Sequence, residues 1–99
     1  MPQHPLQVFD LIDPELRKAV EDLRVLALGE GAMAVKYKIL IAMALDAAHG
    51  ASDGVRSLAN QAMQAGATKE EIAETLRVAL FISGVGSTYT AGRALADSF

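Results

Sequence analysis

The chain has 99 residues, a net charge of −3 and no cysteine. This length suits one small domain, and 52% hydrophobic against 21% charged residues excludes intrinsic disorder. The absence of cysteine excludes disulfides, thiolate metal sites and thiol-based redox chemistry. The sequence contains no run of basic residues, so nothing in it suggests a nucleic-acid partner. The longest apolar run, 39–45, is too short to span a membrane. No secretory leader is recognisable, so we expect a cytoplasmic protein.

Residues 1–12 are interpreted as an N-terminal arm that precedes a helical domain of residues 13–99. Pro2 and Pro5 disfavour a helix in the arm. Its apolar side chains need a surface to pack against, so we expect the arm to lie across another element or a neighbouring subunit. These side chains are Leu6, Val8, Phe9, Leu11 and Ile12.

Five helices are expected from apolar residues at helical spacing between stop signals. The first begins at Asp13 and Pro14, an N-cap residue and a proline at the first helical position. The second is apolar nearly all round, which predicts a central, buried helix. Thr68 and Glu71 form a capping box at the start of the fourth. The first helix is expected to run from residue 13 to a stop at Gly29. The other four helices are expected at 32–49, 52–65, 68–83 and 86–98.

No segment alternates with the period of a strand, so the sequence predicts an all-α fold. The last helix is built of small residues, which would let two backbones approach closely. Such apolar central helices in a short chain also favour a symmetric oligomer, in which other subunits cover part of the apolar surface.

Three stretches carry a resemblance to a known family: Lys36–Leu45, Ala62–Ile72 and Ile82–Gly86. They are similar to the carboxymuconolactone decarboxylase family, whose superfamily includes the alkyl hydroperoxidase D (AhpD) proteins. The most specific part is Ala-x-x-x-Gly-Ala-Thr-x-Glu-Glu-Ile. The resemblance implies an AhpD-like helical protomer that assembles into trimers or hexamers. It also implies either cofactor-free lactone decarboxylation or thiol peroxidase chemistry.

The reactive residues of that family do not occur in this chain. The peroxidases carry Cys-x-x-Cys-x-x-x-His before the Gly-Ala-Thr turn and a glutamate in the preceding helix. Counted back from Gly66, the histidine position falls on Leu58, the cysteine positions on Ala51 and Gly54, and the glutamate position on Ile39. The decarboxylases also tend to keep the histidine. The sequence therefore predicts a degenerate active site without thiol peroxidase activity.

Five polar residues near these positions form the candidate site. His49, the candidate catalytic residue, could move protons or bind a metal, or interact only with the carbonyls at the end of its helix. Ser52, Asp53 and Arg56 open the third helix, where they could bind a carboxylate, or cap the helix and remain solvated. Lys38 could attract an anionic substrate or remain a solvated charge.

A metal site was also considered. Asp46, His49 and Asp53 would share one face of a continuous helix and could supply nitrogen and oxygen ligands. Gly50 and Ser52 are expected to break that helix, so the sequence predicts no metal, and no other cofactor is indicated.

Two functional hypotheses follow. The first is an oligomeric protein that binds a small anionic molecule or a partner and performs no redox chemistry. The alternative is a cofactor-free lyase, decarboxylase or isomerase for a small lactone or carboxylic acid, with His49 as acid, Arg56 as anchor and Lys38 as steering charge. A protein kept only for assembly is a third possibility, and the sequence leaves open whether the chain is an enzyme.

Overall fold

A computed structural model describes residues 4–99, and within that range every regular element is a helix. The all-α prediction is therefore confirmed, with six helices instead of about five. None of the helices described is long and apolar enough to cross a membrane. The helices are α1 (Phe9–Ile12), α2 (Pro14–Leu28), α3 (Val35–Ala48), α4 (Ser52–Gln64), α5 (Lys69–Ser83) and α6 (Val85–Leu95).

The additional helix, α1, lies in the arm, where no helix was expected. Pro2 is outside the described residues, and Pro5 restricts only its own backbone and that of the residue before it. Residues 9–12 are therefore free to form one helical turn, which packs against α2 of the same chain. The guanidinium of Arg17 pairs with the Asp10 carboxylate at 3.0 Å and holds the corner between α1 and α2.

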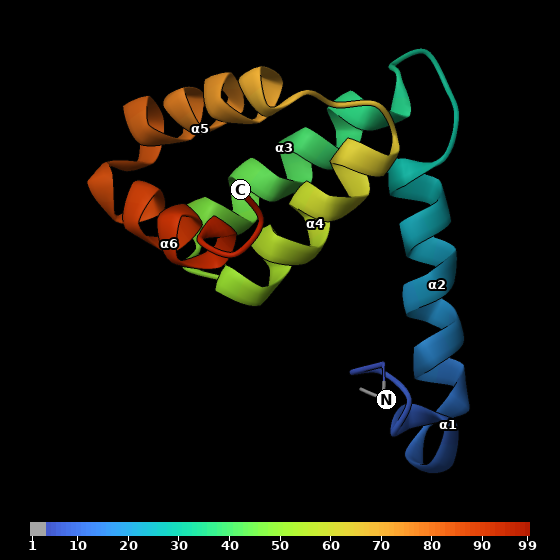
Figure 1. Ribbon diagram of the computed structural model, residues 1–99. Helices are drawn as coiled ribbons and strands as arrows, with labels where there is room; N and C mark the ends of the chain where they lie inside the picture. Colours follow the sequence, from blue (N-terminus) through green and yellow to red (C-terminus); the bar gives the residue numbers. More distant parts are fainter. Residues whose placement is uncertain (1–3) are drawn as a thin grey trace.

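Helix α2 begins where the sequence predicts it. The Asp13 carboxylate accepts a hydrogen bond from the Leu16 amide at 3.1 Å, and Pro14 occupies the first helical position. In Figure 1, α2 stands at the side of the molecule, with α1 at its N-terminal end and helices α3 and α4 near its C-terminal end. No residue of α2 is buried.

Helices α3 to α6 form the body of the molecule (Figure 1). Helix α3 is central because it contacts α2, α4, α5 and α6. Met43 on α3 and Val55 on α4 are the largest fully buried side chains. The start of α3 was placed three residues too early, because the backbone at Ala34 is still extended. The prediction that this helix is buried is confirmed for one face only, since Ile41 and Leu45 are exposed.

The connections within the body follow the local sequence. The capping box at α5 is confirmed: the Glu71 amide donates to the Thr68 hydroxyl at 3.0 Å, and the Thr68 amide donates to the Glu71 carboxylate at 2.9 Å. Gly84 links α5 to α6 with a φ of 86°, a backbone conformation that favours glycine. Helix α6 ends at Leu95 instead of at 98. Its small residues Ser87, Ala91 and Ala94 are buried, whereas Gly86 and Gly92 are exposed and no other backbone approaches them closely.

The molecule is more open than a compact domain of its size. The accessible surface is 6872 Å², whereas a compact protein of this mass exposes roughly 5,400 Å². The radius of gyration is 14.3 Å, against about 13 Å for a compact chain of this length. Both differences follow from the position of α2 beside the body.

Candidate functional site

The positions that correspond to the reactive residues of the family are occupied by apolar or very small residues. Ile39 is buried in the hydrophobic core, and Leu58 is partly buried against that core. Ala51 precedes the first turn of α4 without a side-chain cap. Gly54 lies under the carboxylate of Asp46, so closely that a Cβ atom built on Gly54 would overlap Asp46 Oδ2. In this chain, a carboxylate and two aliphatic side chains fill the region of the missing motif.

His49 lies at the end of α3 and is exposed to solvent. Its amide closes the helix by donating to the Leu45 carbonyl at 3.0 Å. Among residues 4–99, no group of three or more histidine, aspartate and glutamate side chains is arranged to hold a metal ion. Asp46, His49 and Asp53 therefore do not form a ligand set in the described part of the chain.

Arg56 connects two helices. Its Nε donates to the Ala94 carbonyl on α6 at 3.1 Å, and its Nη1 lies 3.4 Å from Asp53 Oδ1. The Asp53 side chain is fully exposed, and Ser52 is half-buried at the first position of α4. The structure thus brings Asp53 and Arg56 together. The Nε of Arg56 is already used in the contact between α4 and α6.

Lys38 lies far from the other candidate residues. Its Nζ donates to the Gly29 carbonyl at 2.6 Å, which fixes the end of α2 to α3. His49 follows eleven residues later at the other end of α3, which corresponds to about 16 Å along the helix axis. The structure therefore does not bring Lys38 and His49 together within one chain.

A polar contact that the sequence did not reveal joins the start of α3 to the start of α5. Lys36 Nζ lies 3.1 Å from Glu71 Oε2, and the Tyr37 hydroxyl lies 3.4 Å from the same oxygen. The hydrogen bond from the Thr68 backbone, followed by that from Lys36, lowers the pKa of Glu71 below its ordinary value. The hydrogen bond to Glu71 raises the pKa of Lys36. The capping box identified Glu71, but nothing in the sequence indicated its partner 35 residues away.

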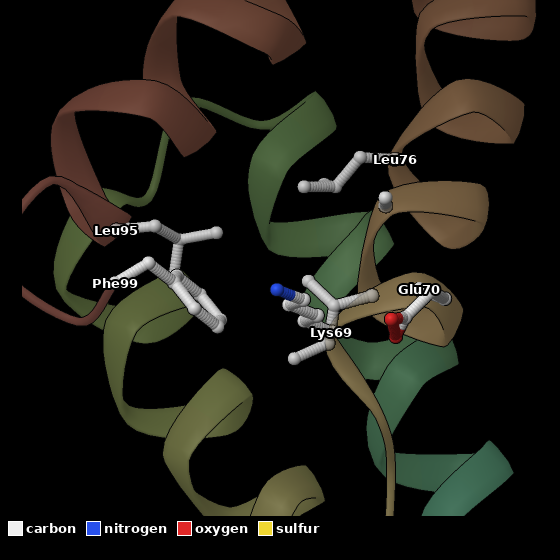
Figure 2. Close-up of a pocket in the computed structure, with 7 residues that line it drawn as sticks. Lys69, Glu70, Leu76, Leu95 and Phe99 are labelled. Carbon is white, nitrogen blue, oxygen red and sulfur yellow. The ribbon is translucent and has the colours of Figure 1, made fainter.

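Sequence reasoning also missed a pocket between α5 and the C-terminal end of α6, shown in Figure 2. The cavity has a volume of about 610 Å³. Its walls are mainly apolar, and its two charged residues are Lys69 and Glu70, which lie between the capping-box residues Thr68 and Glu71. The apolar lining residues are Ile72, Ala73, Leu76, Leu95 and Phe99.

A second hollow lies between α3 and α5 and has a volume of about 350 Å³. Tyr37, Ile41 and Leu45 contribute to it from α3, and Thr75 and Val78 from α5. It is almost entirely apolar, so it offers a surface for packing and few groups for chemistry.

Comparison with known proteins places the chain in a family. The family model described as "Carboxymuconolactone decarboxylase family" matches residues 14–97, a range that contains helices α2 to α6 in full. A search of curated proteins and a search of solved structures gave no match. Because the family model covers most of the sequence, the chain belongs to the carboxymuconolactone decarboxylase family.

Proposed function

We propose that this protein is a self-assembling binding protein of the carboxymuconolactone decarboxylase family that performs no thiol chemistry. The main support for self-assembly is the exposure of the apolar side chains of α2. This helix has 15 residues, an apolar stripe and no buried residue. An isolated helix of this length is marginal in water, because most helical stability in proteins comes from packing of an apolar face. We infer that a second copy of the chain covers α2.

The stripe of α2 is well defined. Leu16, Val20 and Leu23 follow at helical spacing, and Leu26 lies beside them on the same face. All four are exposed, with Leu23 at 63% and Leu26 at 80% of their full accessible surface. The opposite face carries most of the charged residues, so the stripe has the composition of a packing surface.

A surface that suits this stripe lies on α3 and α5. Tyr37, Ile41 and Leu45 repeat every four residues along α3 and are exposed, and Val78 flanks them from α5. Together they border the apolar hollow between the two helices. Helices α2 and α3 have 15 and 14 residues, so one partner helix could cover the whole exposed face of α3.

The area available is sufficient for a stable interface. The chain exposes roughly 1,500 Å² more than a compact protein of its mass. A standard interface buries about 800 Å² on each partner, and obligate interfaces bury more. Burial of the excess surface against a second copy would therefore support a permanent assembly. The trimer or hexamer that the family resemblance implies, and the cytoplasmic location expected from the sequence, stay predictions.

The contacts of the candidate residues favour binding over lyase chemistry within one chain. A lyase would need His49, Arg56 and Lys38 around one substrate. Arg56 and Lys38 instead donate to main-chain carbonyls, and Lys38 lies about 16 Å from His49 along α3. The degenerate active site predicted from the sequence agrees with Ile39 and Leu58 packing in the core.

Native mass spectrometry tests this proposal. We expect the wild-type protein to form a discrete oligomer, and the double substitution Leu23→Ser and Leu26→Ser to convert it to a monomer. Each leucine should contribute about 1–3 kcal/mol through burial in the assembly. Val25→Ser is the matched control, because Val25 is also exposed, at 70%, but lies on the opposite face of α2.

A wild-type protein that is monomeric at micromolar concentration would contradict the proposal. So would an oligomer that survives the double substitution unchanged, because α2 would then have no part in the assembly. In a monomer, substitutions at such exposed positions should change the free energy of unfolding by no more than about 0.5 kcal/mol.

A further inference from the structure

The pocket between α5 and α6 has a distribution of polar groups that suits a particular class of ligand. Its floor and walls are formed by aliphatic side chains and the ring of Phe99. Lys69 and Glu70 stand at one side, in the first turn of α5. The volume of about 610 Å³ lies within the range of ligand pockets, about 300–1,000 Å³.

The two charged side chains occupy different parts of the pocket. Figure 2 shows the Lys69 ammonium directed into the pocket, toward Phe99 and Leu95. The Glu70 carboxylate lies at the rim of the pocket, on the far side of Lys69 from Phe99 and Leu95 in the same view. No ion pair or hydrogen bond of the Lys69 side chain occurs among the described residues. The pocket therefore presents the Lys69 ammonium next to its apolar surface, with the Glu70 carboxylate farther out at the rim.

We propose that this pocket binds a small amphipathic monocarboxylate. The carboxylate would pair with Lys69 Nζ, and the apolar body would lie against Leu76, Leu95 and Phe99. An apolar body gains from leaving water, and a single negative charge at one end complements the Lys69 ammonium. A second carboxylate would lie over apolar side chains with no partner, which disfavours dicarboxylates.

The proposed ligand site is separate from the region of the lost family motif. That region involves Ala51, Gly54 and Leu58 on or next to α4, and none of these residues lines the pocket. The pocket also contains no residue of α2. This proposal rests on the binding function proposed above and names the class of ligand. Absence of ligand binding would not contradict the assembly through α2.

Binding of octanoate and of 1-octanol to the full chain provides the test, with isothermal titration calorimetry as the readout. The two probes share an apolar body and differ in charge. We expect the wild-type protein to bind octanoate about threefold to fivefold more tightly than 1-octanol, as a partly exposed ion pair allows. Lys69→Gln should remove this preference, and Lys18→Gln, a substitution of an exposed lysine on α2, should leave it unchanged.

A second variant tests the apolar part of the site. Ala73 is exposed and lines the pocket, so Ala73→Trp should fill the cavity and weaken binding of both probes at least tenfold. In the unmodified protein, octanoate should shift the methyl NMR signals of Ile72, Leu76 and Leu95. The methyl signals of Ile41 and Leu45, on the exposed face of α3, should not move.

Three results would overturn the proposal. The first is no binding of octanoate to the wild-type protein. The second is an unchanged octanoate preference in Lys69→Gln. The third is methyl shifts that occur on α3 instead of at the pocket. Native mass spectrometry of the same samples reports the oligomer independently, so loss of ligand binding is distinguished from loss of assembly.

Discussion

At the scale of single residues, Asp46 and Gly54 show how this chain differs from the thiol peroxidases it resembles. Position 54 is one of the two positions to which the resemblance assigns a cysteine. Here a half-buried carboxylate from α3 occupies the space that any side chain at position 54 would need. The glycine is required by this close approach and not by its backbone, which is part of the regular helix α4.

This contact predicts the effect of a single methyl group. Gly54→Ala would place Cβ in overlap with Asp46 Oδ2 and 2.8 Å from its Cγ, so the carboxylate must move. Alanine also favours the helix by about 0.5–1 kcal/mol, so the clash is measured against a helical Gly→Ala substitution in open space, Gly92→Ala. We expect Gly54→Ala to be about 1–3 kcal/mol less stable than Gly92→Ala. Urea denaturation followed by circular dichroism measures this change.

The compensating variant and a control make the prediction specific. Asp46→Ala combined with Gly54→Ala should recover most of the lost stability, because the clash is with the carboxylate alone. Gly92→Ala, in α6, places its methyl group in open space and should stabilise the protein by about 0.5–1 kcal/mol. A Gly54→Ala variant as stable as Gly92→Ala would refute the close contact.

At the scale of helices, the ion pair between Lys36 and Glu71 ties α3 to α5 at their N-terminal ends. The ordinary pKa of a glutamate is 4.5, and the Thr68 and Lys36 hydrogen bonds lower the pKa of Glu71 in the folded protein. A lowered pKa in the folded state adds stability above the ordinary value and loses it as the pH falls through the folded pKa. The contact should therefore weaken in acid.

A pH series of thermal unfolding midpoints tests this expectation. At pH 7 the wild type should be more stable than Glu71→Gln, which keeps the size of the side chain and removes its charge. The difference should decrease as the pH falls below about 5, because the wild-type carboxylate becomes protonated and also loses its charge. Glu74→Gln, on the same helix, is the matched control, because the Glu74 carboxylate makes no ion pair or hydrogen bond among residues 4–99. A constant difference for Glu71→Gln between pH 7 and pH 3 would contradict the assignment.

Helix ends were more predictable from the sequence than helix contacts. The caps at Asp13 and Thr68 and the turn at Gly84 depend on residues next to one another, so the pattern contains the necessary information. The contact of Lys36 with Glu71 depends on how two helices pack, which no local pattern encodes. For the same reason the sequence grouped Lys38 with His49, although α3 holds them at opposite ends.

At the scale of the whole molecule, the sequence predicted the helical content but not the position of α2. Its stripe, from Leu16 through Leu23 to Ala27, has the spacing of a core-facing helix. A periodic stripe shows that a helix has a packing face, but it does not show which surface covers that face. In the structure, α2 lies beside the body with this face exposed (Figure 1). The proposed docking of α2 on a second copy of the chain would explain both the predicted oligomer and the open shape of the single chain.

Disulfide cross-linking between single-cysteine variants tests that explanation most directly. The wild-type chain has no cysteine, so in a mixture of Leu23→Cys and Ile41→Cys chains any disulfide joins two copies. Disulfides form only where Cα atoms lie within about 7 Å. Co-expressed variants of different mass, oxidised and analysed by denaturing mass spectrometry, should give a mixed dimer that joins position 23 of one copy to position 41 of the other. Val25→Cys, on the opposite face of α2, should not cross-link with Ile41→Cys. Equal yields from positions 23 and 25, or no mixed dimer from either, would contradict the docking of α2 on α3 of a second copy.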